Sequence, residues 1–511
     1  MSKKIVVIGG SAAGPKAAAR ARRLDQTAEI FMFQKCKELS MASCGFPYYV
    51  GGVFNDRNQL LAAPTGVTRD PTFFMNTKEI IAKVGYEVIK IDRKGKKVHW
   101  KEMETGKTGE QEYDKLIITT GSGAKIPPIP GKDLEGITTL VSIQDADFLR
   151  KIRDEKKIKK AIIIGGGLIG IETCEALELA GIEITIVELL PQILTFLDWE
   201  MAKLVENYLV KKGINVITNN GVAAFLGENG KLTGVKLQNG TELSCELAVV
   251  SIGVFPNSDI AKDAGLEIGP NRGIKINEFM QTSDPDIYAA GDCTEIPQLI
   301  TGKTVHAPYG DLANLEGRVA GENVIKGNTA KFPGTIQTGI CKIFDYTAGA
   351  TGLSERNAKT LGYDVETVIN ASPDKPGFMG AKLLISKLVV DKKDQRLLGY
   401  QCLGPGDVSK QIALAAMALL GKLKVNDLAN LDLPYAPPFS LAIDHFIAGA
   451  HIMQNKLSGQ MTGISAEEVW KKVNSEGETP FILDARGHDE FEQMRLGIGE
   501  VLIPLGKLRK Q

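Results

Sequence analysis

Residues 161–170 have the sequence Ala-Ile-Ile-Ile-Gly-Gly-Gly-Leu-Ile-Gly, an apolar run that leads directly into closely spaced glycines. Such a turn lets backbone N–H groups at a helix N-terminus approach a pyrophosphate. The helix that we expect next ends near Gly181. The stretch therefore predicts the strand, turn and helix of a dinucleotide-binding unit. Its expected contacts are Gly165, Gly167, Leu168, Ile169 and Gly170.

The strand expected over residues 182–187 ends at Glu188, eighteen residues after Gly170. A carboxylate near this spacing accepts hydrogen bonds from the ribose 2′-hydroxyl and repels a 2′-phosphate. No Arg or Lys follows it immediately. We therefore expect this unit to bind NADH rather than NADPH.

An earlier stretch has the same organisation. Residues 4–8 form an apolar strand, a glycine turn and a small-residue helix follow, and a second strand over residues 28–33 ends at Gln34. Gln34 stands where an acid usually binds ribose, and it can accept only through its amide oxygen. We expect a second nucleotide here, contacted by Gly9, Gly10, Ser11, Ala12, Ala13, Gly14 and Gln34.

Composition limits the partners. The 61 Lys and Arg residues balance the 61 Asp and Glu residues, which removes any general electrostatic case for nucleic acid or anionic membrane as a partner. No apolar stretch approaches the ~20 residues needed to cross a bilayer. The N-terminus passes directly into the nucleotide-binding pattern, which differs from a signal peptide. We expect a cytoplasmic protein without a membrane span.

Seven cysteines are scattered along the chain, with no CxxC pair and no histidines at zinc spacing. A disulfide framework and a metal site are therefore not expected. Isolated cysteines are most often small buried apolar residues. Only Cys44, in the segment Ser40–Tyr49, has a context that indicates chemistry.

Residues 113–122 and 282–292 resemble the two later FAD motifs of the two-dinucleotide flavoprotein reductases, and the resemblance covers about residues 1–450. It implies that FAD occupies the first unit and NADH the second. It also implies that Asp292 binds the ribityl chain, that Val88 contacts adenine, and that Thr120 and Gly121 lie near the flavin nucleotide.

The implied fold is α/β, with two nested Rossmann-like dinucleotide-binding domains, an α+β dimerisation domain and a short rhodanese-like C-terminal remnant. The expected FAD-binding domain is discontinuous, residues 1–120 and 255–325, with the NADH-binding domain, residues 121–254, inserted. Residues 326–450 are expected to form the dimerisation domain and residues 463–511 the truncated rhodanese-like segment.

The segment around Cys44 resembles the single-cysteine pyridine nucleotide–disulfide oxidoreductases, the coenzyme A disulfide reductase and NADH-dependent persulfide reductase group. Their Asn-Cys-Gly-Leu-Pro-Tyr core has Ser43 and Phe46 in place of Asn and Leu here. A second cysteine four or five residues later is absent, so Cys44 must pair with an external sulfur. The resemblance implies transfer of electrons from NADH through FAD to a disulfide, persulfide or polysulfide. Coenzyme A is a candidate substrate or thiol cap on Cys44.

Two other functions remain open. An NADH oxidase or peroxidase would cycle one cysteine through sulfenic acid, but those enzymes have a histidine in the first glycine loop where this chain has Ala12. An NADH-oxidising electron-transfer subunit of a larger complex would deliver its electrons to a protein partner. The missing histidine favours sulfur reduction over peroxide chemistry.

The resemblance also implies a substrate site and a homodimer with a shared active site. The guanidinium group of arginine can donate two parallel hydrogen bonds to a phosphate. Each arginine could equally lie on a solvated helix face. Tyr435 resembles a tyrosine that reaches the partner's cysteine, whereas a second family tyrosine is replaced in residues 374–377. The expected substrate contacts are Arg20, Arg23, Ser40, Ser43, Asn314 and Arg318.

Residues 481–491 resemble the first half of a rhodanese domain, and no cysteine follows Cys402. We therefore expect this remnant not to relay sulfur. It is a candidate docking site for a protein partner.

Overall fold

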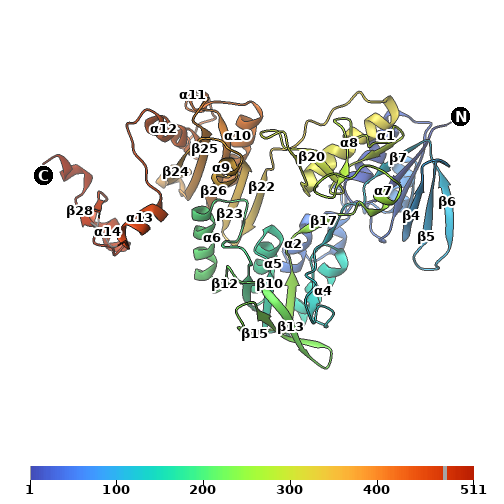
Figure 1. Ribbon diagram of the computed structural model, residues 1–511, viewed down its shortest axis with the longest axis horizontal. Helices are drawn as coiled ribbons and strands as arrows, with labels where there is room; N and C mark the ends of the chain where they lie inside the picture. The colour runs from blue at the N-terminus through green and yellow to red at the C-terminus, as the bar shows by residue number, and fades with distance from the viewer. Residues whose placement is uncertain (1, 476–479, 511) are drawn as a thin grey trace. The chain divides into compact units, whose positions relative to one another are not determined.

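The computed structural model describes residues 2–475 and 480–510. The chain forms two compact units, Met1–His451 and Ile452–Gln511 (Figure 1). No helix among the described residues is both long and apolar enough to cross a membrane.

The first sheet is parallel, and its strand order is β19-β7-β1-β2-β3. One edge strand, β3, comes from the first part of the chain. The other edge strand, β19, follows the strands of the second sheet in sequence and pairs with β7. The strands are β1 (Lys4–Ile8), β2 (Glu29–Gln34), β3 (Ile80–Val84), β7 (Lys115–Ile118) and β19 (Ile287–Ala289). The chain therefore returns to the first sheet after it has formed the second, as nested domains require.

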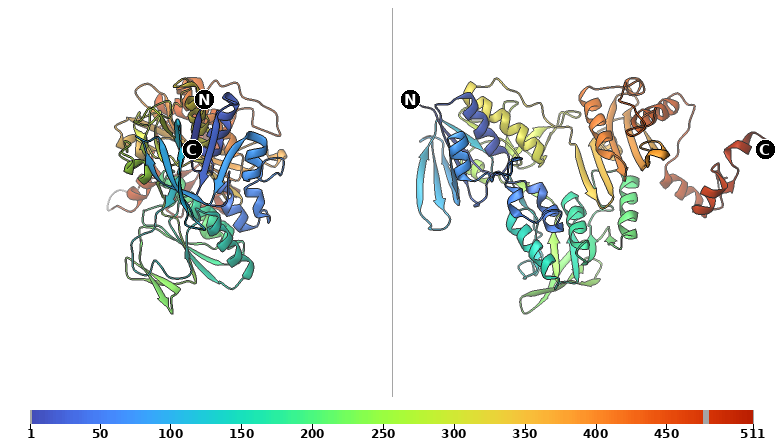
Figure 2. Two further views of the ribbon diagram at one scale, coloured as in Figure 1. Left: turned by 90° about the vertical axis from the view of Figure 1, so that its right-hand side faces the viewer. Right: turned by 180° about the vertical axis from the view of Figure 1, so that it is seen from behind.

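Helices α1 (Ala13–Leu24) and α8 (Gly310–Lys326) pack side by side, dark blue and yellow in Figures 1 and 2. A side chain at Gly317 would overlap the backbone of Ala13, and one at Gly321 would overlap the backbone of Ala17. These glycines allow the two helices to approach closely. The N-terminus of α8 is thereby fixed beside the first glycine turn.

The second sheet is also parallel, and its strand order is β12-β11-β10-β16-β9. The expected strand, turn and helix occur as β10, the glycine turn and α5. The strands are β9 (Ile137–Thr138), β10 (Lys160–Ile164), β11 (Glu183–Val187), β12 (Asn215–Ile217) and β16 (Leu247–Val250). The helices are α4 (Ile143–Glu155), α5 (Leu168–Glu178) and α6 (Trp199–Lys211).

The third sheet is antiparallel, with the order β22-β23-β26-β25-β24. Helix α10 (Val408–Leu420) packs on β23 and β26. The strands are β22 (Gly339–Ile343), β23 (Tyr346–Gly352), β24 (Val365–Pro373), β25 (Leu383–Asp391) and β26 (Leu397–Gly404). The other helices here are α9 (Glu355–Thr360), α11 (Val425–Leu428) and α12 (His445–Leu457).

A buried charge cluster joins α6 to this third sheet. The Lys387 side chain on β25 is only 2 % exposed. Its ammonium contacts the carboxylates of Asp198 at 3.1 Å, Glu200 at 2.5 Å and Glu355 at 2.5 Å. Gln401 donates a further hydrogen bond to Asp198 at 2.6 Å. The cluster links the second sheet's helix to the third sheet.

Smaller elements complete the chain. The one that carries Cys44 is η1 (Ser43–Gly45), which leads directly into α2 (Phe46–Gly51). Antiparallel strands flank the first and second sheets: β4 (Tyr86–Asp92), β5 (Lys97–Glu102), β6 (Thr108–Glu112), β13 (Val222–Glu228), β14 (Lys231–Leu237) and β15 (Glu242–Ser244). β8 (Ser122–Ala124) pairs with β17 (Val254–Pro256). A small three-stranded sheet has the order β18 (Ile274–Lys275), β20 (Thr294–Pro297), β21 (Thr304–Val305). Short helices are η2 (Arg57–Leu60), α3 (Pro71–Lys78), α7 (Asp259–Asp263) and η3 (Gly377–Met379).

The second compact unit contains α13 (Ala466–Val473), α14 (His488–Gln493), η4 (Leu505–Lys510) and a parallel pair of β27 (Leu483–Asp484) and β28 (Val501–Leu502). Ser465 caps α13 and exchanges hydrogen bonds with Glu468. The rhodanese-like assignment of the segment stays a prediction, and so do the exact domain boundaries.

Candidate active site

The first glycine turn connects β1 to α1. Gly9 has φ +105°, and a side chain there would overlap the backbone of Thr119. A side chain at Gly14 would overlap the carbonyl oxygen of Gly9 and approach the Thr119 hydroxyl at 2.7 Å. Only glycine fits both positions, and the turn leaves the N-terminus of α1 open to a phosphate.

Gln34, at the end of β2, turns toward this glycine turn. Its amide oxygen accepts a hydrogen bond from the Gly10 N–H at 2.8 Å, and its amide nitrogen donates to the Glu38 carbonyl at 3.2 Å. The second glycine turn has an equivalent hydrogen bond, because the Glu188 carboxylate accepts from the Gly166 N–H at 2.7 Å. The amide thus makes the turn-closing bond that the carboxylate makes in the other unit.

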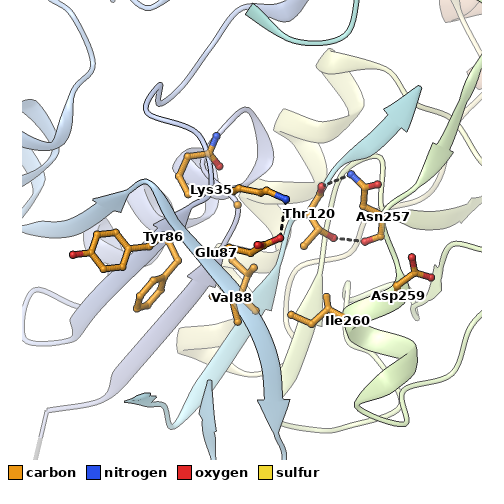
Figure 3. Close-up of a pocket in the computed structure, with 12 residues that line it drawn as sticks. Lys35, Tyr86, Glu87, Val88, Thr120, Asn257, Asp259 and Ile260 are labelled. Carbon is orange, nitrogen blue, oxygen red and sulfur yellow. Dashed lines mark hydrogen bonds and ion pairs between the residues drawn. The ribbon is translucent and has the colours of Figure 1, made fainter. Parts of the chain in front are cut away.

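An open cavity of about 440 Å³ lies at the carboxyl end of β1. Val88, Thr120 and Asn257 line it. The Thr120 hydroxyl donates to the Asn257 carbonyl at 2.5 Å, and the Asn257 side-chain amide donates to the Thr120 carbonyl at 3.0 Å (Figure 3). The other lining residues of the cavity are Ile8, Gly9, Phe33, Gln34, Lys35, Tyr86, Glu87, Asp259 and Ile260. The structure therefore brings together the predicted Gly9, Gln34, Val88 and Thr120.

Asp292 follows β19 and is largely enclosed. Its carboxylate accepts a hydrogen bond from the Ser122 hydroxyl at 2.9 Å, while burial raises its pKa. The preceding residue, Gly291, donates its N–H to the buried Glu316 carboxylate at 2.7 Å. Gly121 has φ +68° and no neighbour where a side chain would project. These contacts fix the loop on which a ribityl chain would rest.

The second glycine turn has the same shape as the first. Gly165 has φ +104°, and a side chain at Gly170 would overlap the Gly165 carbonyl oxygen. Gly167, the N-cap of α5, has nothing within 4 Å of the place where a Cβ would lie. This space at a helix N-terminus fits a pyrophosphate. Both turns therefore fit a dinucleotide.

Cys44 lies in η1, directly before α2, and its side chain is exposed. Its sulfur is 3.6 Å from where a side chain of Gly310 would begin, so it lies at the N-terminus of α8. Of the other six cysteines, Cys36 is exposed and the remaining five are buried. Cys44 thus combines accessibility with a position at the end of a long helix.

Two opposing influences act on the ionisation of the Cys44 thiol. Desolvation by the surrounding protein raises the pKa of the Cys44 thiol, and the carboxylates of Glu172, Asp292 and Asp311 raise it further. The α8 N-terminus favours the opposite, anionic form. The thiolate fraction of Cys44 is therefore set by the α8 N-terminus, which favours the thiolate, against desolvation and three carboxylates, which favour the thiol.

The predicted substrate residues lie on α1, on α8, in the segment before η1 and, for Ser43, in η1 itself. Arg20 forms an ion pair with Glu322 and donates from Nε at 3.1 Å. Arg23 and Arg318 are exposed. Asn314 donates its side-chain amide to the Gly310 carbonyl at 2.7 Å. Ser40 is half-buried, and Ser43 is exposed beside Cys44.

Tyr435 lies in the segment between α11 and α12, and 56 % of it is exposed. Within residues 2–475 and 480–510, no hydrogen bond joins it to Cys44 of the same chain. Phe439 and Ile443, close to it in sequence, are also exposed, at 74 % and 51 %. A role for Tyr435 at Cys44 of a second subunit stays a prediction.

Residues 3–307 match the family model described as pyridine nucleotide-disulphide oxidoreductase, and residues 338–447 match the dimerisation domain of the same family. The chain belongs to this family. It is therefore an FAD- and NAD(P)H-dependent oxidoreductase.

The chain is 32 % identical to a Methanocaldococcus jannaschii protein named NADH oxidase, over 89 % of this chain and 100 % of that one. It is 34 % identical to the Pyrococcus horikoshii NAD(P)H coenzyme A polysulfide/persulfide reductase, over 89 % of this chain and 99 % of the relative. The solved structure of an NAD-dependent persulfide reductase from A. fulgidus is 40 % identical, with a TM-score of 0.94, over 99 % of this chain and 91 % of that one.

Three further residues, Tyr48, Glu172 and Asn257, lie beside the predicted site residues. Tyr48 on α2 donates its hydroxyl to the Glu172 carboxylate on α5 at 3.1 Å, only four residues after Cys44. Asn257 lines the cavity. Tyr48 had a sequence signal, because it ends the Cys-Gly-Phe-Pro-Tyr segment that resembles the family core. Glu172 is one of three acids on α5 and had no signal of its own.

Proposed function

We propose that this oxidoreductase transfers electrons from NADH through FAD to a sulfur–sulfur bond at Cys44, and that its substrate is a disulfide, persulfide or polysulfide of the coenzyme A type. The observation that carries the proposal is the exposed Cys44 at the N-terminus of α8. The other exposed cysteine, Cys36, follows β2, and Cys44 has no second cysteine beside it in sequence. An external sulfur must therefore complete the redox pair.

The first glycine turn, Gln34, Thr120 and Asp292 would hold FAD, and the second turn with Glu188 would hold NADH. When bound, FAD supplies the transfer of two electrons from NADH to sulfur. The Cys44 thiolate attacks one sulfur of the substrate, forms a new S–S bond and releases the other sulfur as a thiolate. Two electrons then cleave the new bond, which returns Cys44 as a thiolate and frees the second thiolate.

The proposal includes a homodimer whose active site is shared between the two subunits. The matched dimerisation domain and the exposed apolar residues near Tyr435 favour a second copy on this face. Tyr435 would then protonate or orient the leaving sulfur at the partner's active site. We place the reaction in the cytoplasm, where NADH is available.

The relatives support the substrate class. Among those matched, several carry names for coenzyme A-dependent sulfur, polysulfide or disulfide reduction. Arg20 is already paired with Glu322, so Arg23 and Arg318 would be the principal phosphate contacts if the substrate is a coenzyme A derivative. A free polysulfide would need neither arginine.

The test is steady-state NADH oxidation by purified holoenzyme with coenzyme A disulfide, coenzyme A persulfide, polysulfide, peroxide and oxygen in parallel. We expect a sulfur compound to give the highest kcat/KM and Cys44→Ser to abolish that activity. Cys36→Ser, the matched control at the other exposed cysteine, should retain it. Equal rates for wild type and Cys44→Ser would contradict the proposal.

NADH oxidase activity is the second candidate, because the Methanocaldococcus jannaschii relative carries that name. Ala12 occupies the first glycine turn where a proton-transferring histidine would be required. Oxygen or peroxide turnover that exceeds turnover with every sulfur compound would favour this candidate.

A further inference from the structure

Glu172 lies on α5, two residues after the last glycine of the second turn, and faces α2, the helix that begins two residues after Cys44. The Tyr48 hydroxyl donates to its carboxylate at 3.1 Å. Tyr48 and Cys44 belong to one short continuous segment, η1 followed by α2. The carboxylate is therefore held in place by the same segment that carries the redox cysteine.

The groups around Glu172 leave it without a cation of its own. Lys342 on β22 pairs with Glu175, whose other oxygen accepts the Phe344 N–H at 2.7 Å. Cys341 on the same strand is buried. Among the residues that the structure describes, no ion pair involves Glu172. Its negative charge is thus stabilised mainly by the Tyr48 hydroxyl.

This environment makes the charge of Glu172 variable near neutral pH. Burial raises the pKa of Glu172 to about 7, Glu175 raises it, and the hydrogen bond from Tyr48 and the charge of Lys342 lower it. A carboxyl with such a pKa changes its charge near neutral pH.

The charge of Glu172 acts on Cys44. After desolvation, it is the largest influence that raises the pKa of the Cys44 thiol, ahead of Asp292 and Asp311. Asp292 accepts a hydrogen bond from the Ser122 hydroxyl, and Asp311 lies in the first turn of α8. Of these three carboxylates, Glu172 alone is held by the segment that contains Cys44.

We propose that Glu172, held by Tyr48, is a positioning residue that controls how much of Cys44 is thiolate. The charged carboxylate holds Cys44 as a thiol, and the neutral carboxyl allows the thiolate to form. The inference rests on the proposed function only in treating Cys44 as the nucleophile. The ionisation of Cys44 can be measured without any sulfur substrate.

The test is the rate of Cys44 alkylation by iodoacetamide in reduced holoenzyme, followed by mass spectrometry of the Cys44 peptide between about pH 6 and pH 10. We compare wild type, Glu172→Gln, Tyr48→Phe and Glu178→Gln, a control that removes a charge from the other end of α5. Iodoacetamide reacts with the thiolate, so its rate reports the thiolate fraction.

Glu172→Gln should lower the midpoint of the profile by about one pH unit, which is about a tenfold faster alkylation below the midpoint. Wild type should depart from a single ionisation, because Glu172 titrates in the same range. Tyr48→Phe should shift in the same direction by a smaller amount near neutral pH, since it removes a bond that favours the charged carboxylate. Glu178→Gln should match wild type.

A Glu172→Gln profile that superimposes on wild type would overturn the inference. If that variant does not bind FAD or fold, an unshifted Tyr48→Phe profile would overturn it in the same way. Failure of the proposed function would look different, because the profiles would shift as expected while no sulfur compound gave Cys44-dependent turnover.

Discussion

Gly167→Ala tests whether the second glycine turn binds the dinucleotide, and the structure allows its effect to be separated from folding. A Cβ at Gly167 would meet nothing within 4 Å, and the backbone has φ −78°, which any residue can adopt. The change in folding free energy should therefore stay within about 1 kcal/mol. Gly170→Ala is a poorer choice, since its Cβ would overlap the Gly165 carbonyl and approach the Ser251 hydroxyl at 2.7 Å.

The same methyl group would occupy the space through which a pyrophosphate approaches the N-terminus of α5. We expect KM for NADH to rise at least about tenfold, a loss of about 1.4 kcal/mol of binding, with FAD content unchanged. The assay is steady-state kinetics with varied NADH, together with the Tm and the flavin absorbance of each variant.

Gly506→Ala is the control, because a Cβ there also meets open space but lies in the second compact unit. A Gly167→Ala enzyme with wild-type KM and full flavin content would refute the placement of NADH at this turn. A large fall in Tm would instead contradict the conclusion that the space is free in the fold.

Three other predictions follow from the described contacts. Lys387→Met should destabilise the protein by about 3–5 kcal/mol, because it leaves buried carboxylates unpaired. Urea unfolding of the control Lys275→Met, which removes an ion pair with Glu267 in which both side chains are exposed, should match wild type. Glu188→Ala should reduce the preference of kcat/KM for NADH over NADPH, and an unchanged ratio would contradict its role at the ribose. Tyr435→Phe should lower turnover by at least about tenfold with flavin reduction by NADH unchanged. Heterodimers that combine this variant with Cys44→Ser should regain activity only if Tyr435 acts across the dimer.

The parts of the fold that sequence could predict are those whose causes are local. A buried strand, a glycine turn and a small-residue helix are specified by neighbouring residues, so both dinucleotide units were predictable. The strand expected over residues 28–33 occurs at Glu29–Gln34. The contact of Gln34 with Gly10 was harder to predict, because it depends on the orientation of an amide rather than on charge.

The parts that sequence could not predict depend on residues far apart in the chain. Arg20 appeared available for phosphate because its partner, Glu322, lies some 300 residues later on a helix that packs against α1. Glu172 contacts Tyr48 only because α5, in the second dinucleotide-binding unit, packs on α2, which follows the first one in sequence. Neither pairing has a local sequence signal.

The central claim is that Cys44 delivers electrons to an external sulfur, and rapid mixing of Cys44→Ser with NADH and then with the best sulfur substrate tests it most directly. Reduction of the flavin by NADH should proceed at the wild-type rate, because that step does not need the thiol. Reoxidation by the sulfur substrate should be lost. Reoxidation of the flavin at the wild-type rate in Cys44→Ser would contradict the account.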